Sequence, residues 1–164
     1  MKKNIILAFI VIGLAYIAIQ KPQFSDEPTK NKISTVNIDT IKNITIISAD
    51  QAAIKFVKKD KSWFLLINNE EVPALKSKMN HLFQLLNTES LDNFTASGEQ
   101  LKQFKLLNPR LQVKYDNLTI AFGDSEPLKH RRYIFTHKKV HLIQNVFYHL
   151  LLQPENTYIK TEIE

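Results

Sequence analysis

Residues 123–143 form the segment of this chain that is richest in side chains able to do chemistry. Its later part carries the basic residues and histidines Lys129, His130, Arg131, Arg132, His137, Lys138, Lys139 and His141. No Asp or Glu lies between Pro127 and Pro154. A basic side chain near an anionic membrane contributes roughly 1 kcal/mol, so the hairpin 129–141 is a candidate surface for acidic lipid headgroups. Its candidate binding residues are Lys129, Arg131, Arg132, Tyr133, Lys138 and Lys139.

The same hairpin also has a purely structural interpretation. Successive residues of a strand face opposite sides, so Arg131 and Tyr133 share one face while Arg132 shares the other with Ile134. The charge is then divided between two faces, and lysines at the turn 137–139 are typical of any exposed turn. The sequence leaves both interpretations open.

Asp124 and Glu126 form a close pair of carboxylates, and His130 follows them. Paired carboxylates do acid and base chemistry when their environments separate their pKa values, so an envelope hydrolase with a site at 124–132 is one hypothesis. The neighbouring Arg131 and Arg132 favour a simpler one, in which ion pairs hold the segment in shape. No G-x-S-x-G or S-x-x-K nucleophile signature accompanies these residues. We therefore expect no catalytic residues and a protein that is not an enzyme.

Metal and cofactor sites are not expected either. His137 and His141 have the spacing of a zinc-binding pair, but a hairpin turn is predicted between them and no third ligand lies nearby. The chain has three glycines, too few for a phosphate-binding loop. Gly123 and Asp124 are interpreted as a turn that leaves the strand ending at Phe122. The absence of Cys removes disulfides, thiolate zinc sites, a cysteine nucleophile and a lipoprotein anchor.

The first 21 residues predict a membrane anchor. Two lysines precede an apolar run from Ile5 to Ile19, which Gln20 and Lys21 close. The run is short for the ~30 Å hydrocarbon layer, and snorkelling of Lys3 and Lys21 recovers the difference. A cleaved secretory signal is the alternative. The positive-inside rule predicts a cytoplasmic amino terminus, an inner-membrane location and a periplasmic domain. Half of the net charge of +6 belongs to lysines 2, 3 and 21, so nucleic acid is not an expected partner.

Residues 22–32 contain two prolines and mixed charge, which indicates a tether. Residues 33–164 then predict an α+β domain of antiparallel strands with two main helices packed on them. The helices are expected at about 73–87, starting at Pro73, and at 145–152, with a shorter one at 97–104 capped by Ser97. Each half reads as strands, a hairpin and a helix, which is compatible with two diverged copies of one unit.

Several short motifs give the chain a family resemblance. They are Trp63 in an early hairpin, then Phe104, Leu106 and Pro109, then Phe122, Gly123, Asp124, Pro127 and Leu128, then Arg131, Arg132 and Tyr133, and finally residues 140–143. Over residues 44–160 the chain resembles the bacterial domain of unknown function 4340 family, in its short membrane-anchored form. Longer relatives are associated with gliding-type ABC transport systems, and this short chain departs from their architecture. The resemblance implies no catalytic residues, because none are established for the family.

These patterns together predict a membrane-anchored periplasmic domain without catalytic activity, which contacts a protein partner or another component of the cell envelope. No small-molecule substrate is identified. Trp63 and Tyr133 are large aromatics that fill the core in most domains, although a partner groove uses the same residue types. The two alternatives are the lipid-contacting hairpin 129–141 and the hydrolase site at 124–132.

Overall fold

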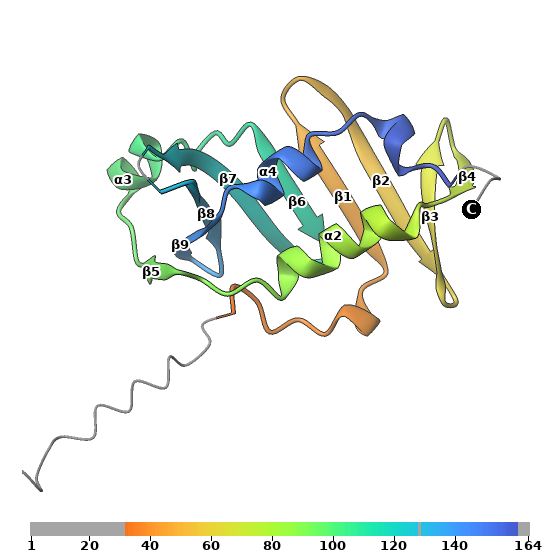
Figure 1. Cartoon of the computed structure of the whole chain (residues 1–164), viewed down its shortest axis with the longest axis horizontal. Helices are drawn as coiled ribbons and strands as arrows, with labels where there is room; N and C mark the ends of the chain where they lie inside the picture. Colours follow the sequence, from red (N-terminus) through yellow and green to blue (C-terminus); the bar gives the residue numbers. More distant parts are fainter. Residues whose placement is uncertain (1–31, 128, 161–164) are drawn as a thin grey trace, which may run out of the picture.

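The computed structural model of the chain describes residues 32–127 and 129–160, which form an α+β domain on one antiparallel sheet (Figure 1). The sheet has nine strands in these described residues, in the order β4-β3-β2-β1-β6-β7-β8-β9-β5. The α+β prediction is therefore confirmed. The anchor predicted at 1–21 and nearly all of the tether predicted at 22–32 lie outside the described residues. Within the described ranges, no helix is both long enough and apolar enough to cross a membrane.

Two meanders make up the sheet, and each is followed by a helix. The first contains β1 Asn43–Ser48, β2 Gln51–Lys59, β3 Ser62–Ile67 and β4 Glu70–Pro73, followed by α2 Lys76–Leu86. The second contains β6 Leu111–Tyr115, β7 Leu118–Glu126, β8 Arg131–Thr136 and β9 Lys139–Gln144, followed by α4 Val146–Leu151. Strand β5 Asp92–Phe94 and helix α3 Gly98–Gln103 lie between the two meanders. The 3-10 turn η1 Ile38–Thr40 precedes β1, and the 3-10 turn η2 Glu155–Tyr158 follows α4. The antiparallel pairing of β1 with β6 joins the two meanders.

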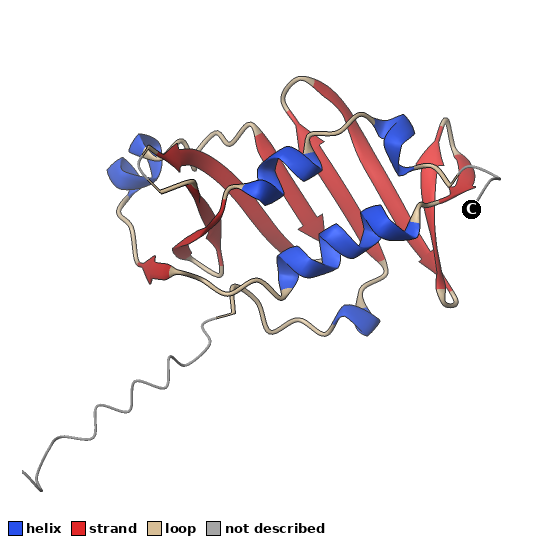
Figure 2. Cartoon of the chain, in the orientation of Figure 1, coloured by secondary structure: helices blue, strands red, loops and turns tan. Residues whose placement is uncertain are grey.

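Both α2 and α4 cross the same face of the sheet (Figure 2). Alternate strand residues such as Ile44 and Ile46 of β1 are buried against them, as the period of two in the strands requires. Helix α2 contributes Met79, Leu82, Leu85 and Leu86 at helical spacing. The core therefore lies between this face and the two helices.

The first main helix begins later than the sequence predicts. Residues Glu70–Pro73 form the edge strand β4, and α2 starts at Lys76. Asn68 and Asn69 both have positive φ, a tight turn that asparagine tolerates, and it folds β4 back onto β3. Pro73 thus ends an edge strand, where its missing N–H is tolerated. Helices α3 and α4 match their predicted positions, and Ser97 forms the capping box of α3 with Gln100.

The junction of the two meanders is held by Asp116 at the β6–β7 turn. Its carboxylate accepts hydrogen bonds from the backbone N–H of Lys42 and of Asn43, each at 2.9 Å, and from the Asn43 amide at 3.0 Å. Partial burial acts to raise the pKa of Asp116, but these hydrogen bonds outweigh it and the pKa is lowered from 3.8. The ionised side chain therefore fastens the start of β1 to the second meander.

We expect Asp116→Ala to lower the free energy of unfolding by about 1 kcal/mol at pH 7, because two backbone donors lose a charged acceptor. A carboxylate with a lowered folded pKa stabilises the fold above its unfolded pKa, and this contribution is lost as the pH falls through the folded pKa. The difference between wild type and variant should therefore begin to shrink below about pH 4 and be smaller at pH 3 than at pH 7. Urea unfolding of the full chain at pH 7 and pH 3 measures it. An unchanged difference at pH 3 would contradict the ionic origin.

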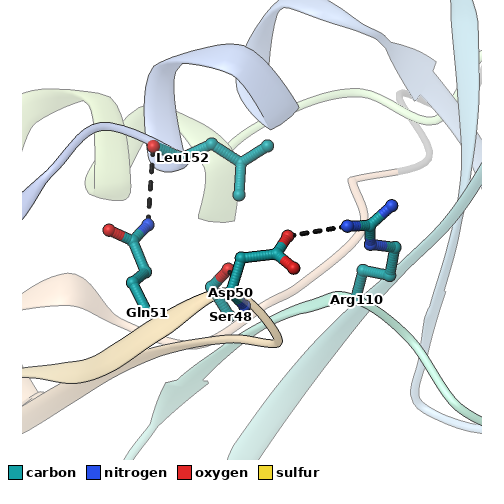
Figure 3. Close-up of polar contacts among 5 residues, drawn as sticks. All are labelled: Ser48, Asp50, Gln51, Arg110 and Leu152. Atoms are coloured by element: carbon teal, nitrogen blue, oxygen red, sulfur yellow. Dashed lines mark hydrogen bonds and ion pairs between the residues drawn. The ribbon is translucent and has the colours of Figure 1, made fainter.

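The turn between β1 and β2 also contacts the second half of the chain (Figure 3). Arg110 donates to the Asp50 carboxylate at 2.7 Å, and the amide of Gln51 donates to the carbonyl of Leu152 at 3.4 Å. The backbone N–H of Ala49 donates to the Arg110 carbonyl at 2.9 Å. The Gln51 contact joins the end of α4 to the first meander, and the two contacts of Arg110 join the β1–β2 turn to the start of β6.

Candidate functional site

A cleft of about 640 Å³ lies between the first half of α2 and the sheet. We call it the Trp63 cleft. Its apolar lining comes from Trp63 of β3 with Met79 and Phe83 of α2, and the rings of Trp63 and Phe83 pack with their centroids 5.8 Å apart. Ligand sites in proteins usually occupy roughly 300–1,000 Å³ and have mainly apolar linings. The cleft therefore has the size and lining of a binding site.

Lysines surround this apolar floor. The lining includes Lys58, Lys61, Lys76 and Lys160 against one acidic residue, Asp39. The ammonium group of Lys58 donates to the backbone carbonyl of Asp39 at 2.9 Å, which ties it to η1. Lys61, Lys76 and Lys160 are exposed. The rim carries a net positive charge. The cleft is therefore suited to an occupant with an apolar part that contacts the floor and acidic groups that lie at the rim.

Four separate parts of the chain build the cleft. Strand β3 and helix α2 provide the floor, η1 provides one wall, and the C-terminal segment closes one end. This segment is fixed by hydrogen bonds from Leu75 N–H to the Tyr158 carbonyl at 2.7 Å and from Lys160 N–H to the Pro73 carbonyl at 3.0 Å. Tyr158 is buried against Phe56, and burial raises its pKa to about 12. Only Trp63 among the lining residues is a candidate from sequence, because nothing local links residues 38, 63, 83 and 160.

Arg131 and Arg132, which the sequence placed in one candidate surface, lie on opposite faces of β8. Arg131 makes two hydrogen bonds to the Glu126 carboxylate, at 2.5 and 2.9 Å. This pairing lowers the pKa of Glu126 and raises that of Arg131. Arg132 faces the helices: it donates to Asn145 at 2.6 Å and to the Gly123 carbonyl, and its guanidinium lies 3.5 Å from the centre of the Tyr148 ring. Both arginines are therefore engaged within the fold.

The other predicted binding residues are dispersed. Tyr133 stacks on Phe104 with ring centroids 4.3 Å apart. Lys129 is exposed before β8, while Lys138 and Lys139 are exposed at its far end. The six-residue strand β8, which is about 20 Å long, separates Lys129 from Lys138 and Lys139. The structure thus gathers Lys138 and Lys139 at the hairpin tip and leaves Lys129 at the opposite end.

Gly123 and Asp124 do not form the turn that the sequence predicted. Strand β7 continues to Glu126, and the pairing register with β8 shifts between Phe122 and Ser125. This bulge accommodates the loop after α3, because Asp124 N–H donates to the Phe104 carbonyl at 2.9 Å. The carboxylate of Asp124 pairs with Lys105 at 3.0 Å. Phe104, Gly123 and Arg132, which belong to the motifs of the family resemblance, therefore lie together where the loop after α3 meets β7 and β8.

The hydrolase hypothesis receives no support from this geometry. Asp124 pairs with Lys105 and Glu126 pairs with Arg131, so the two carboxylates serve separate ion pairs. His130 is exposed in the loop before β8. Among residues 32–127 and 129–160, no cluster of three or more His, Asp or Glu side chains could hold a metal ion. His137 is exposed while His141 is buried.

Comparisons with protein-family models, with curated proteins and with solved structures find no match to this chain. The fold and the cleft define the class of this protein: an α+β domain with a nine-stranded antiparallel sheet in its described part and an aromatic cleft surrounded by lysines. Membership of the domain of unknown function 4340 family stays a prediction from the sequence.

Proposed function

We propose that this protein is a single-pass, membrane-anchored binding domain that holds an acidic segment of a partner protein in the Trp63 cleft, without catalysing a reaction. The observation that carries the proposal is the cleft itself, with an aromatic floor and four lysines against one aspartate in its lining. Aromatic side chains in a pocket anchor partners, and surrounding lysines select an acidic one.

The location is part of the same proposal. The apolar run 5–19 anchors the chain in the bacterial inner membrane, residues 22–32 act as the tether, and the domain lies in the periplasm. The support is the order of lysines, apolar run and polar remainder in the sequence. The partner is then another envelope protein, and the domain would contribute to envelope assembly.

We further infer that the two meanders are diverged copies of one unit. The support is their shared order of four strands followed by a helix. The antiparallel pairing of β1 with β6 at the centre of the sheet is what a two-fold relation between the copies would require. Under this relation the aromatic floor of the cleft belongs to the first copy, since Trp63 has no aromatic counterpart in sequence at the start of β8.

Photo-crosslinking in intact membranes tests the partner proposal. A photoreactive phenylalanine analogue placed at Asn80, an exposed residue that lines the cleft, should trap one defined protein identified by mass spectrometry. The same group at Lys114, an exposed residue of β6 outside the cleft, is the control and should not trap it. Equal trapping from both positions, or none from Asn80, would refute the cleft as the binding site.

We expect Trp63→Ala to weaken binding of the trapped partner roughly tenfold or more, because removal of an aromatic anchor that the partner covers costs about 2 kcal/mol. Trp63→Phe keeps an aromatic floor and should keep most of the affinity. The double variant Lys61→Glu/Lys76→Glu changes only exposed rim charges and should weaken binding, with a weaker salt dependence. Binding by the purified full chain that is unaffected by both changes would contradict an acidic occupant.

A further inference from the structure

A second cavity, independent of the Trp63 cleft, lies where the described chain begins. It has a volume of about 280 Å³, and its lining consists of Lys32, Ile33, Ser34, Thr35, Asn93, His137, Lys139 and His141. Lys32 brings the N-terminal segment next to the tip of the β8–β9 hairpin. We call this second cavity the His141 cavity. Its lining contains two lysines and two histidines and no carboxylate, so it favours a negative occupant.

His141 is the unusual member of this lining. The residue is 6% exposed, and its Nε2 atom is buried with no hydrogen-bond partner within the described part of the chain. Buried polar atoms are nearly always paired, so each exception requires an explanation. Thr136 Oγ1 is a second such atom, and Thr136 lies on the same face of the neighbouring strand.

The hydrogen bonds around His141 define the state of its other nitrogen. Nδ1 lies 3.1 Å from the Ser90 hydroxyl, and that hydroxyl donates its hydrogen to the Asp92 carbonyl at 2.5 Å. Ser90 Oγ must then accept the bond from Nδ1–H. Nε2 of the neutral ring is consequently a bare lone pair, which repels an anion, whereas the protonated ring presents an N–H donor there. An anion that bonds to Nε2 must therefore bring a proton to His141.

We propose that the His141 cavity binds a tetrahedral oxyanion of the phosphate class, with His141 becoming protonated as the anion binds. Lys32 and Lys139 supply charge, and Ser34, Thr35 and Asn93 line the cavity with polar groups. The protonated Nε2 supplies a charge-assisted hydrogen bond. The anion is either free in solution or part of a lipid headgroup, because the hairpin tip lies beside the point where the chain leads to its proposed anchor.

Charged groups around His141 set the direction of the pH dependence. Burial lowers its pKa from 6.5, and Lys139 and His137 lower it further. Lys32 adds positive charge from the N-terminal segment, and its backbone forms a β-bridge with Glu89. The Asp92 carboxylate accepts a hydrogen bond from the Asn93 N–H at 2.8 Å. Without an anion, His141 is neutral at pH 7. Protonation favours binding, so affinity should fall about tenfold per pH unit between the pKa of the free site and the pKa of the occupied site.

Nuclear magnetic resonance titration of the imidazole nitrogens in the full chain tests this proposal. Inorganic sulfate is a suitable probe because its charge does not change between pH 5 and pH 8. In uncharged bicelles, sulfate should raise the pKa of His141 by about one unit or more, a tenfold preference for the protonated ring. His149, exposed on α4, is the internal control and should not follow.

A second sample, in bicelles containing phosphatidylglycerol and without sulfate, separates the two sources. A pKa rise of His141 with sulfate supports a free anion, and a rise with the anionic lipid alone supports a headgroup. No rise in either sample, or an equal rise of His149, would overturn the proposal and leave an internal water as the partner of Nε2.

Two variants extend the test beyond the histidine itself. Lys139→Ala should weaken sulfate binding up to about fivefold, because an exposed charge beside the anion contributes up to about 1 kcal/mol. Lys114→Ala removes an equally exposed lysine from β6 and should change nothing. His141→Gln should reduce the pH dependence of sulfate binding between pH 6 and pH 8, with His137 as the remaining histidine of the lining. Identical effects of the two lysine variants would indicate general screening and refute the site.

Discussion

Gly123→Ala is expected to lower the free energy of unfolding by about 3 kcal/mol, at the upper end of the cost of overpacking. A Cβ at this position would lie 2.2 Å from the backbone carbonyl oxygen of Phe104 and 2.9 Å from two side-chain carbons of Leu106. The carbonyl cannot yield as a flexible side chain would, because it already accepts a hydrogen bond from Asp124 N–H. The loop after α3 must move away from the bulge in β7, and that bond is lost.

Urea unfolding of the full chain, followed by the fluorescence of Trp63, measures this change, since the chain has one tryptophan. For a slope of about 2 kcal/mol/M, the midpoint should fall by about 1.5 M. Gly98→Ala is the matched control: no atom lies within 4 Å of its added Cβ. In the first turn of α3, alanine should be neutral or stabilising by up to about 0.5 kcal/mol. Equal effects of the two substitutions would show that the close approach at Gly123 is not the cause.

Arg132→Ala is expected to destabilise the domain by about 2–3 kcal/mol. The change removes a charged hydrogen bond to Asn145, another to the Gly123 carbonyl, and the contact with the Tyr148 ring. Burial lowers the pKa of Arg132, but a guanidinium remains charged at neutral pH, so it depends on these partners. Arg132→Lys keeps the charge but loses the planar fork, and should recover only part of the stability.

The neighbouring Arg131 provides the comparison. Its ion pair with Glu126 lies on the other face of β8, where each side chain keeps about a fifth of its surface exposed. Arg131→Ala should therefore cost clearly less than Arg132→Ala in the same unfolding measurement. If the two substitutions were equivalent, the packing of Arg132 against α4 would not be its main role.

The local elements of this domain were predictable because each depends on neighbours in sequence. Ser97 and Gln100 form the capping box of α3 three residues apart, and the Asp116–Asn117 turn lies between two alternating strands. The division of charge between Arg131 and Arg132 follows from the period of two in a strand. The helix predicted from Pro73 starts only at Lys76, and strand β4 was missed, because an edge strand and a helix start share the same composition and only pairing with β3 distinguishes them.

By itself, the sequence determined the α+β class, the strand hairpins and most helix positions, since hydrophobic period and turn chemistry are local properties. Only the tertiary structure decided the pairing of β1 with β6, the bulge at Gly123, and the two cavities. Each of these joins residues that are many positions apart, such as Trp63 with Lys160 or Lys32 with His141. The loss of chain entropy on bringing such residues together is compensated by burial over the whole sheet, which no short stretch of sequence records.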